Sequence, residues 1–164
     1  MLVIESRVDV PGLTGRDVTD FMVSCTDEQY RRWWPGTHLQ LHVLGRATGG
    51  VGDVVVMDEF IGRRRLRLRG VVEAVEPGRR LVWRFRKLVP LPARLSLQLS
   101  AVPGGVSVRH TITAGWPGIG RALDPLLRLY FTPGFTADLD AHVRTEFPLL
   151  RDYLRPGSAS RTDS

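Results

Sequence analysis

Alternation between apolar and polar side chains over residues 38–115 is the feature that most restricts the fold of this chain. Turn-forming stretches interrupt it at "GRATGG", "GRR", "EPGRR", "VPLP" and "VPGG" and divide it into five or six segments. A period of two residues, bounded by glycine and proline, is typical of strands joined by short connections. The sequence therefore predicts an antiparallel meander.

Two of these segments have faces that the sequence defines clearly. In "RRRLRLRG", Leu66 and Leu68 alternate with arginines, and in "RRLVWRFRK" the apolar positions are Leu81, Trp83 and Phe85. The short "EPG" connection makes the two segments hairpin partners, so their arginines gather on one outer surface. This surface is interpreted as a solvated face, with a homodimer contact or an anionic surface as the alternatives. Nucleic-acid binding is not expected because no aromatic residue is interleaved with these charges.

Other elements surround the predicted sheet. Residues 1–10 alternate as an opening strand, and two short helices should follow, from about residue 15 and from Thr26 to "YRRWWPG". Asp124-Pro125 begins a further helix, and a long helix should run over about residues 136–155 after the break at "TPG". This order predicts an α+β helix-grip fold, in which a curved antiparallel sheet wraps around the long C-terminal helix.

Composition limits the domain organisation and the cellular context. With 164 residues and 43% apolar content, the chain suits one domain over residues 1–155, followed by a polar, disordered tail at 156–164. Cys25 is the single cysteine, and no signal peptide or membrane-spanning run is present, so a soluble cytoplasmic protein is expected. Lys87 is the single lysine among 23 basic residues, so the net charge of +6 is attributed to biased composition rather than to an anionic partner.

The long C-terminal helix carries two ionisable residues on its apolar side. On a helical wheel with Leu139 at zero, Val143, Phe147 and Leu150 fall between about 20° and 80°. His142 and Glu146 fall at about 300° and 340°, so both should face the interior. An ionised carboxylate in an apolar interior costs several kcal/mol unless it is paired or protonated.

Three arrangements would satisfy this pair: a hydrogen bond across one helical turn, a bound water, or a divalent metal ion that both side chains ligate. A metal would need further ligands from the sheet. His38 follows the "WWPGT" corner, and Glu59 shares its strand face with apolar residues, so both are candidates. His42 is expected to point outward, whereas His110 points inward and competes with His38 for this role.

The order of elements over about residues 1–155, together with "YRRWWPG", resembles the SRPBCC superfamily, also called the Bet v 1-like or START-like fold. The resemblance implies an apolar cavity between sheet and long helix, used by family members for lipids, metabolites, polyketide intermediates or catalysis.

A narrower resemblance concerns the candidate site. The spacings Tyr30–His38 and His142–Glu146, with Glu59 between them, are similar to the zinc site of the diacetylphloroglucinol and phloretin hydrolase branch. The resemblance implies His38, Glu59, His142 and Glu146 as zinc ligands, Tyr30 as a phenol that binds substrate, and cleavage of a carbon–carbon bond between an acyl group and a polyhydroxylated ring. The chain departs from that branch in being much shorter and in carrying apolar Leu41 where those hydrolases have a polar residue.

The sequence is compatible with three functions. The first is a zinc-dependent hydrolase or lyase acting on a hydrophobic aromatic ketone or polyketide-like compound, with Tyr30 and His110 as catalytic groups. The second is a metal-free polyketide cyclase or aromatase, in which His142, Glu146 and His110 act as acid–base groups. The third is a carrier of a hydrophobic ligand or lipid. Each needs a cavity wall for an apolar small molecule, and the residues expected to line it are Trp33, Trp34, Trp83, Phe147 and Leu150.

Overall fold

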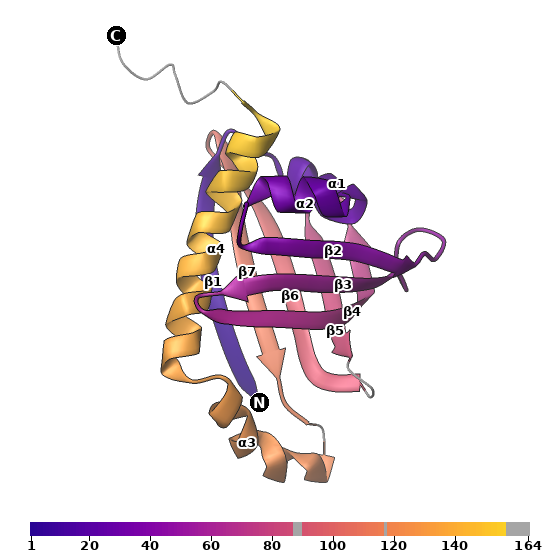
Figure 1. Ribbon diagram of the computed structural model, residues 1–164, viewed down its shortest axis with the longest axis vertical. Helices are drawn as coiled ribbons and strands as arrows, with labels where there is room; N and C mark the ends of the chain where they lie inside the picture. Colours follow the sequence, from indigo (N-terminus) through magenta and orange to yellow (C-terminus); the bar gives the residue numbers. More distant parts are fainter. Residues whose placement is uncertain (87–89, 117, 157–164) are drawn as a thin grey trace.

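The structure is a computed structural model that describes residues 1–86, 90–116 and 118–156 (Figure 1). The chain begins with one strand and two short helices, continues through six further strands, and ends in three helical segments. In order these are β1 (Leu2–Pro11), α1 (Gly15–Ser24), α2 (Asp27–Trp33), β2 (His38–Gly45), β3 (Val54–Ile61), β4 (Arg64–Glu76), β5 (Arg80–Arg86), β6 (Pro90–Val102), β7 (Gly105–Ala114), the 3-10 helix η1 (Gly118–Leu123), α3 (Asp124–Tyr130) and α4 (Pro133–Leu154).

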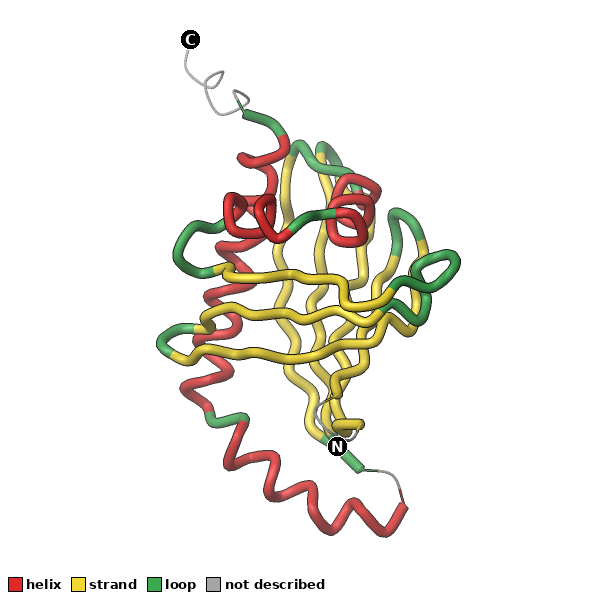
Figure 2. Tube along the Cα trace, turned by 45° about the vertical axis from the view of Figure 1, so that its right-hand side comes forward, coloured by secondary structure: helices red, strands yellow, loops and turns green. Residues whose placement is uncertain are grey.

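The strands form one antiparallel sheet in the order β1-β7-β6-β5-β4-β3-β2. The sheet curves, and α4 runs along its open side in contact with β1 and β3, while α1 and α2 cover one end (Figures 1 and 2). The α+β helix-grip prediction is confirmed. This arrangement places the apolar face of α4 against the concave face of the sheet.

Local signals explain where the helices begin. Thr14 and Thr26 each cap a helix through a reciprocal capping box, with Asp17 and Gln29 respectively. Thr132 caps α4, and Pro133 occupies its first turn, where its missing N–H costs no hydrogen bond. Because of this cap, α4 starts three residues earlier than the sequence pattern indicated.

The "VPLP" stretch was expected to be a turn, but β6 already begins at Pro90 and pairs with β5 there. The predicted disordered tail, residues 156–164, lies almost entirely outside the described residues.

The arginines of β4 and β5 lie on the outer face of the sheet, as predicted, and carboxylates accompany them. Asp58 accepts two hydrogen bonds from Arg65, at 2.9 and 2.8 Å. Glu73 pairs with Arg84 at 3.0 Å and with Arg94 at 2.6 Å. These ion pairs favour the interpretation of this surface as a solvated face.

Among the described residues, no helix is long and apolar enough to cross a lipid bilayer.

Candidate metal centre

Helix α4 contributes two of the four polar side chains at the centre. His142 and Glu146 are 6% and 8% exposed, and they share the buried side of the helix with Leu139, Val143 and Phe147. This is the orientation that the helical wheel predicts. One turn of helix separates the two residues, so both side chains leave α4 in nearly the same direction.

Strands β2 and β3 contribute the other two. His38 is the cross-strand partner of Glu59, so their side chains lie next to each other on the concave face. A bulge follows between His38 and Gln40. The extra residue reverses the alternation, which is why His38 and Leu41 are both buried although three positions separate them.

The bulge also places the His42 side chain on the opposite face of the sheet from His38. This side chain is half exposed and its Nδ1 lies 3.1 Å from Asp27 Oδ2 on the outside of the sheet. The expectation that His42 points outward is confirmed, and His38 rather than His110 joins the group on α4.

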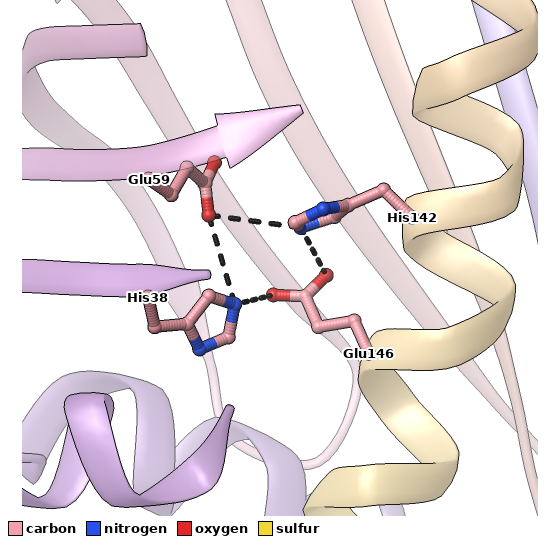
Figure 3. Close-up of side chains that lie close together, drawn as sticks. All are labelled: His38, Glu59, His142 and Glu146. Atoms are coloured by element: carbon pink, nitrogen blue, oxygen red, sulfur yellow. Dashed lines mark ion pairs between the residues drawn. The ribbon is translucent and has the colours of Figure 1, made fainter. Parts of the chain in front are cut away.

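The four side chains converge on one point (Figure 3). His38 Nε2 lies 3.4 Å from Glu146 Oε1 and 3.7 Å from Glu59 Oε2. His142 Nε2 lies 3.7 Å from Glu59 Oε2 and 3.9 Å from Glu146 Oε2. Most of these separations are too long for hydrogen bonds. Two ligands bound tetrahedrally to one zinc ion stand about 3.3–3.4 Å apart, so the distances fit a shared ion better.

The donor set suits a divalent cation in two further ways. One ligand atom from each of the four residues lies within 4.8 Å of all the others. The His38 side chain is fully buried, and its Nε2, which faces the two carboxylates, makes no hydrogen bond. Buried polar atoms are normally satisfied, and a metal ion is one of the partners that such orphaned atoms indicate. The His38–Glu59–His142–Glu146 group could therefore hold a metal ion.

The protonation states of the two histidines and two glutamates also suit a metal site. Burial lowers the pKa of His38 to about 4, and burial also lowers the pKa of His142. Both imidazoles are therefore neutral near pH 7, as metal ligands must be. Burial and the neighbouring Glu146 carboxylate raise the pKa of Glu59 to about 7, and burial raises the pKa of Glu146. The two carboxylates repel each other when both are ionised, and a bound cation would stabilise their ionised forms.

Helix α2 and Trp34, which caps it, supply aromatic side chains that contact the residues of the centre. The Tyr30 hydroxyl donates a 2.7 Å hydrogen bond to Glu59 Oε2, and its ring stacks on His38 with a centroid distance of 4.1 Å. The Trp33 indole N–H donates to the backbone oxygen of Glu146 at 2.9 Å. The Trp34 ring lies 4.7 Å from the His142 ring. Such outer contacts fix the orientation of metal ligands.

An apolar cavity of about 470 Å³ adjoins the centre, and Glu59 lies in its wall. Apolar side chains from the sheet, α3 and α4 form most of the lining, among them Met57, Phe85, Leu95, Ile112, Leu127, Phe131, Phe135 and Leu139. The size suits a small-molecule ligand. The contribution of α3 was not foreseen, although the apolar residues of "LLRLYF" are a signal that could have indicated it.

His110 lies in the wall of this cavity and outside the four-residue group. Its Nδ1 is buried without a hydrogen-bond partner. Burial and the nearby His142 lower the pKa of His110 to about 4, so its ring is neutral at pH 7. The prediction that His110 points inward is confirmed.

The residues expected to contact a ligand lie in three different places. Trp34 lies beside the centre, as described. Trp83 lines a second cavity, of about 330 Å³, between α1 and strands β2 to β5. Trp33, Phe147 and Leu150 are fully buried in the core between α4, α2 and the sheet. Their role in ligand binding stays a prediction.

No model of a known protein family matches the chain, and no curated protein matches it in sequence. Several solved structures are similar to the chain in fold. The di-domain ARO/CYC protein BexL, from the BE-7585A biosynthetic pathway, is 18% identical with a TM-score of 0.60, over 94% of this chain and 51% of that one. The KanY protein is 11% identical with a TM-score of 0.61, over 94% and 98% of the two chains. The major latex-like protein 151 of Panax ginseng is 14% identical with a TM-score of 0.55, over 87% and 98%.

At these identities the likeness concerns the fold. The comparison therefore supports the helix-grip fold of the chain. One fold of this kind serves many chemistries, and the choice among them depends on the residues of the site.

Proposed function

We propose that the protein is a zinc-dependent hydrolase that cleaves the carbon–carbon bond between an acyl group and an aromatic ring in a hydrophobic ketone. The observation that supports this proposal most is the convergence of two neutral histidines and two glutamates at distances suited to one ion. The apolar cavity beside Glu59 is large enough for an aromatic substrate.

The residues fit the chemistry that zinc supplies, which is polarisation of a ketone oxygen and activation of a water molecule. The overall reaction consumes one water. Its oxygen forms a new bond to the acyl carbon, the bond from that carbon to the ring breaks, and the ring carbon takes up a proton. The products are a carboxylic acid and the deacylated ring.

Within this proposal, Glu59 marks the side from which substrate approaches. It is the most exposed of the four ligands, with 21% of its side chain accessible, and it faces the cavity. Burial and the Glu59 carboxylate raise the pKa of Tyr30, which therefore keeps its proton at neutral pH. Tyr30 thus acts as a donor that holds Glu59. The neutral His110 ring, across the cavity, is suited to bind a hydroxyl group of the substrate or to relay a proton.

The test is hydrolysis of acyl-phloroglucinol and simpler aryl ketones by zinc-loaded protein in ¹⁸O-labelled water, followed by mass spectrometry. We expect one ¹⁸O in the carboxylic acid product and loss of turnover after chelation. Glu146→Gln should lower turnover by at least about a hundredfold, whereas His42→Ala, which changes an exposed histidine, should retain it. Zinc-loaded protein that cleaves none of these ketones, or turnover that survives Glu146→Gln, would contradict the proposal.

A second candidate is a metal-free cyclase or aromatase, favoured by the unpartnered His110 in the cavity wall and by the likeness to BexL. In that case chelation leaves activity on a poly-β-ketone unchanged, and His110→Phe abolishes it. A carrier function predicts instead a ligand that is released unaltered.

A further inference from the structure

Exposed apolar side chains gather on the segment formed by η1 and α3, residues 118–130. Ile119 is 99% exposed and Leu129 is 77% exposed. Three more large apolar side chains of the segment are exposed, so it holds half of the ten found in the described part of the chain: Leu123, Leu126 and Tyr130 complete the five. The segment projects from one end of the sheet (Figures 1 and 2). Clusters of this kind mark interaction surfaces.

Positive charge borders the same surface. Arg121 and Arg128 lie within the segment, and both are exposed. The Arg64 guanidinium, from the start of β4, lies 4.6 Å above the Tyr130 ring. The acidic residue of the segment, Asp124, is occupied, because it pairs with the amino group of Met1 and accepts a 3.0 Å hydrogen bond from the Trp116 backbone N–H. The surface therefore combines apolar side chains with exposed arginines, and the charge of Asp124 is shared between the Met1 amino group and Arg121.

This combination fits the surface of an anionic lipid bilayer. Apolar and aromatic side chains enter the boundary between headgroups and acyl chains, while arginines contact lipid phosphates. A second copy of the chain fits less well. A stable dimer usually needs about 20–30 residues on each side, more than this segment holds, and a twofold contact would bring equal charges together.

The inner side of the segment leads to the cavity. Leu126, Leu127, Tyr130 and Phe131 belong to the cavity wall, and Leu126 and Tyr130 are also among the exposed residues. We propose that residues 118–130 dock on an anionic phospholipid bilayer and that a hydrophobic ligand passes between bilayer and cavity along α3. This proposal does not depend on the metal, so metal-free protein should bind vesicles as well as zinc-loaded protein.

The test is co-sedimentation of the full chain with vesicles of phosphatidylcholine alone, or with about 30 mol% phosphatidylglycerol. We expect binding to the anionic vesicles that weakens with added salt. The double variant Ile119→Ser/Leu129→Ser should lower the partition coefficient at least about tenfold. Arg121→Gln/Arg128→Gln should lower it by about tenfold as well, and only on anionic vesicles.

The matched control is Leu44→Ser/Val51→Ser, which replaces two apolar side chains that are 49% and 48% exposed in other parts of the molecule. It should bind like the unmodified protein. Absence of binding to anionic vesicles, or equal losses in the control and in Ile119→Ser/Leu129→Ser, would overturn the proposal. A dimer in sedimentation equilibrium that Ile119→Ser/Leu129→Ser dissociates, without vesicle binding, would assign the surface to a second copy instead.

Discussion

Glu59 lies in an unfavourable electrostatic environment at the centre. Its carboxylate lies near Glu146, and its oxygen is 3.7 Å from a histidine nitrogen on either side. Both histidines are neutral near pH 7, so neither offers a full positive charge. A cation would remove the conflict, and without one the carboxyl group is most stable when protonated.

This unfavourable environment predicts that the free energy of unfolding of metal-free protein depends on pH. The folded-state pKa of Glu59, about 7, exceeds the ordinary glutamate pKa of 4.5, so the folded state binds more protons between these values. The contribution of Glu59 to the free energy of unfolding is then complete below about pH 4.5 and is lost as the pH rises through about 7. Glu59→Gln removes this loss. In urea titrations, metal-free Glu59→Gln should gain on the order of 1–3 kcal/mol relative to unmodified protein between about pH 5 and pH 8.

The control for this measurement is Glu5→Gln, which replaces an exposed carboxylate on β1. Because this side chain is 48% exposed, the substitution should change the free energy of unfolding by less than about 0.5 kcal/mol. A Glu59→Gln gain no larger than the effect of this control would show that Glu59 is not destabilised in the folded state.

Cys25 allows a second test at the residue scale. Its thiol is 7% exposed, and burial together with the nearby Asp27 raises its pKa to about 12. Since the thiolate is the reactive form, iodoacetamide should alkylate the native protein very slowly at pH 8 and the protein in concentrated guanidinium rapidly. Mass spectrometry of timed samples measures both rates. Rapid native labelling would mean that Cys25 is accessible.

At the scale of secondary-structure elements, α2 is a support for the centre. It is seven residues long, and it holds Tyr30 against Glu59 and Trp33 against the backbone of α4. A helix this short depends on its cap. Thr26→Ala removes the side chain that accepts from the Gln29 backbone N–H, at 3.2 Å.

We expect Thr26→Ala to lower the free energy of unfolding by about 0.5–2 kcal/mol and to weaken zinc affinity through the displaced ligands. Denaturant titration and zinc competition with a chromogenic chelator measure the two effects. Thr145→Ala is the control, because Thr145 is exposed within α4 and its hydroxyl donates to the Ala141 backbone oxygen of the same helix. Equal effects of the two substitutions would argue against a supporting role of the α2 cap.

Some side-chain directions at the centre could be predicted from the sequence, and one could not. The face of α4 follows from its period, so His142 and Glu146 could be placed inside from the sequence. The inward direction of Glu59 follows from strand alternation in β3 in the same way. His38 is different, because simple alternation gives it the same face as His42, and the bulge after His38 separates them. A bulge depends on pairing with β3, which no local pattern in β2 encodes.

The packing of α3 could not be predicted from its residues alone. The sequence predicts a helix that begins at Asp124-Pro125, and the structure shows that some of its apolar residues are exposed and that others line the cavity. Helical spacing indicates which residues share a face, but the surface that a seven-residue helix contacts is decided by the packing of distant strands.

At the scale of the whole molecule, the centre joins parts that are distant in the chain. Its ligands come from the start of β2, from β3 and from the middle of α4, so one ion would tie the long helix to the far edge of the sheet. An ion that binds only the folded state stabilises it in proportion to the logarithm of its concentration over the dissociation constant.

Zinc should therefore raise the melting temperature of the protein. Chelation should lower it by on the order of 5–15 °C, and added zinc should restore it. Scanning calorimetry with and without a chelator measures the shift. His142→Ala should melt at the same temperature with and without zinc, while His42→Ala should respond like the unmodified protein. A melting temperature indifferent to zinc in unmodified protein would contradict a structural contribution of the centre.

The most direct measurement of the central claim is the zinc content of protein purified without a metal-binding tag, loaded with excess zinc and dialysed. Elemental analysis should give about one zinc per chain for the unmodified protein and for His42→Ala. His38→Ala and Glu146→Ala, shown to be folded by circular dichroism, should retain less than about a tenth of that amount. Unmodified protein that retains no zinc after loading, or His38→Ala that retains as much as His42→Ala, would contradict the assignment of these four residues as a metal centre.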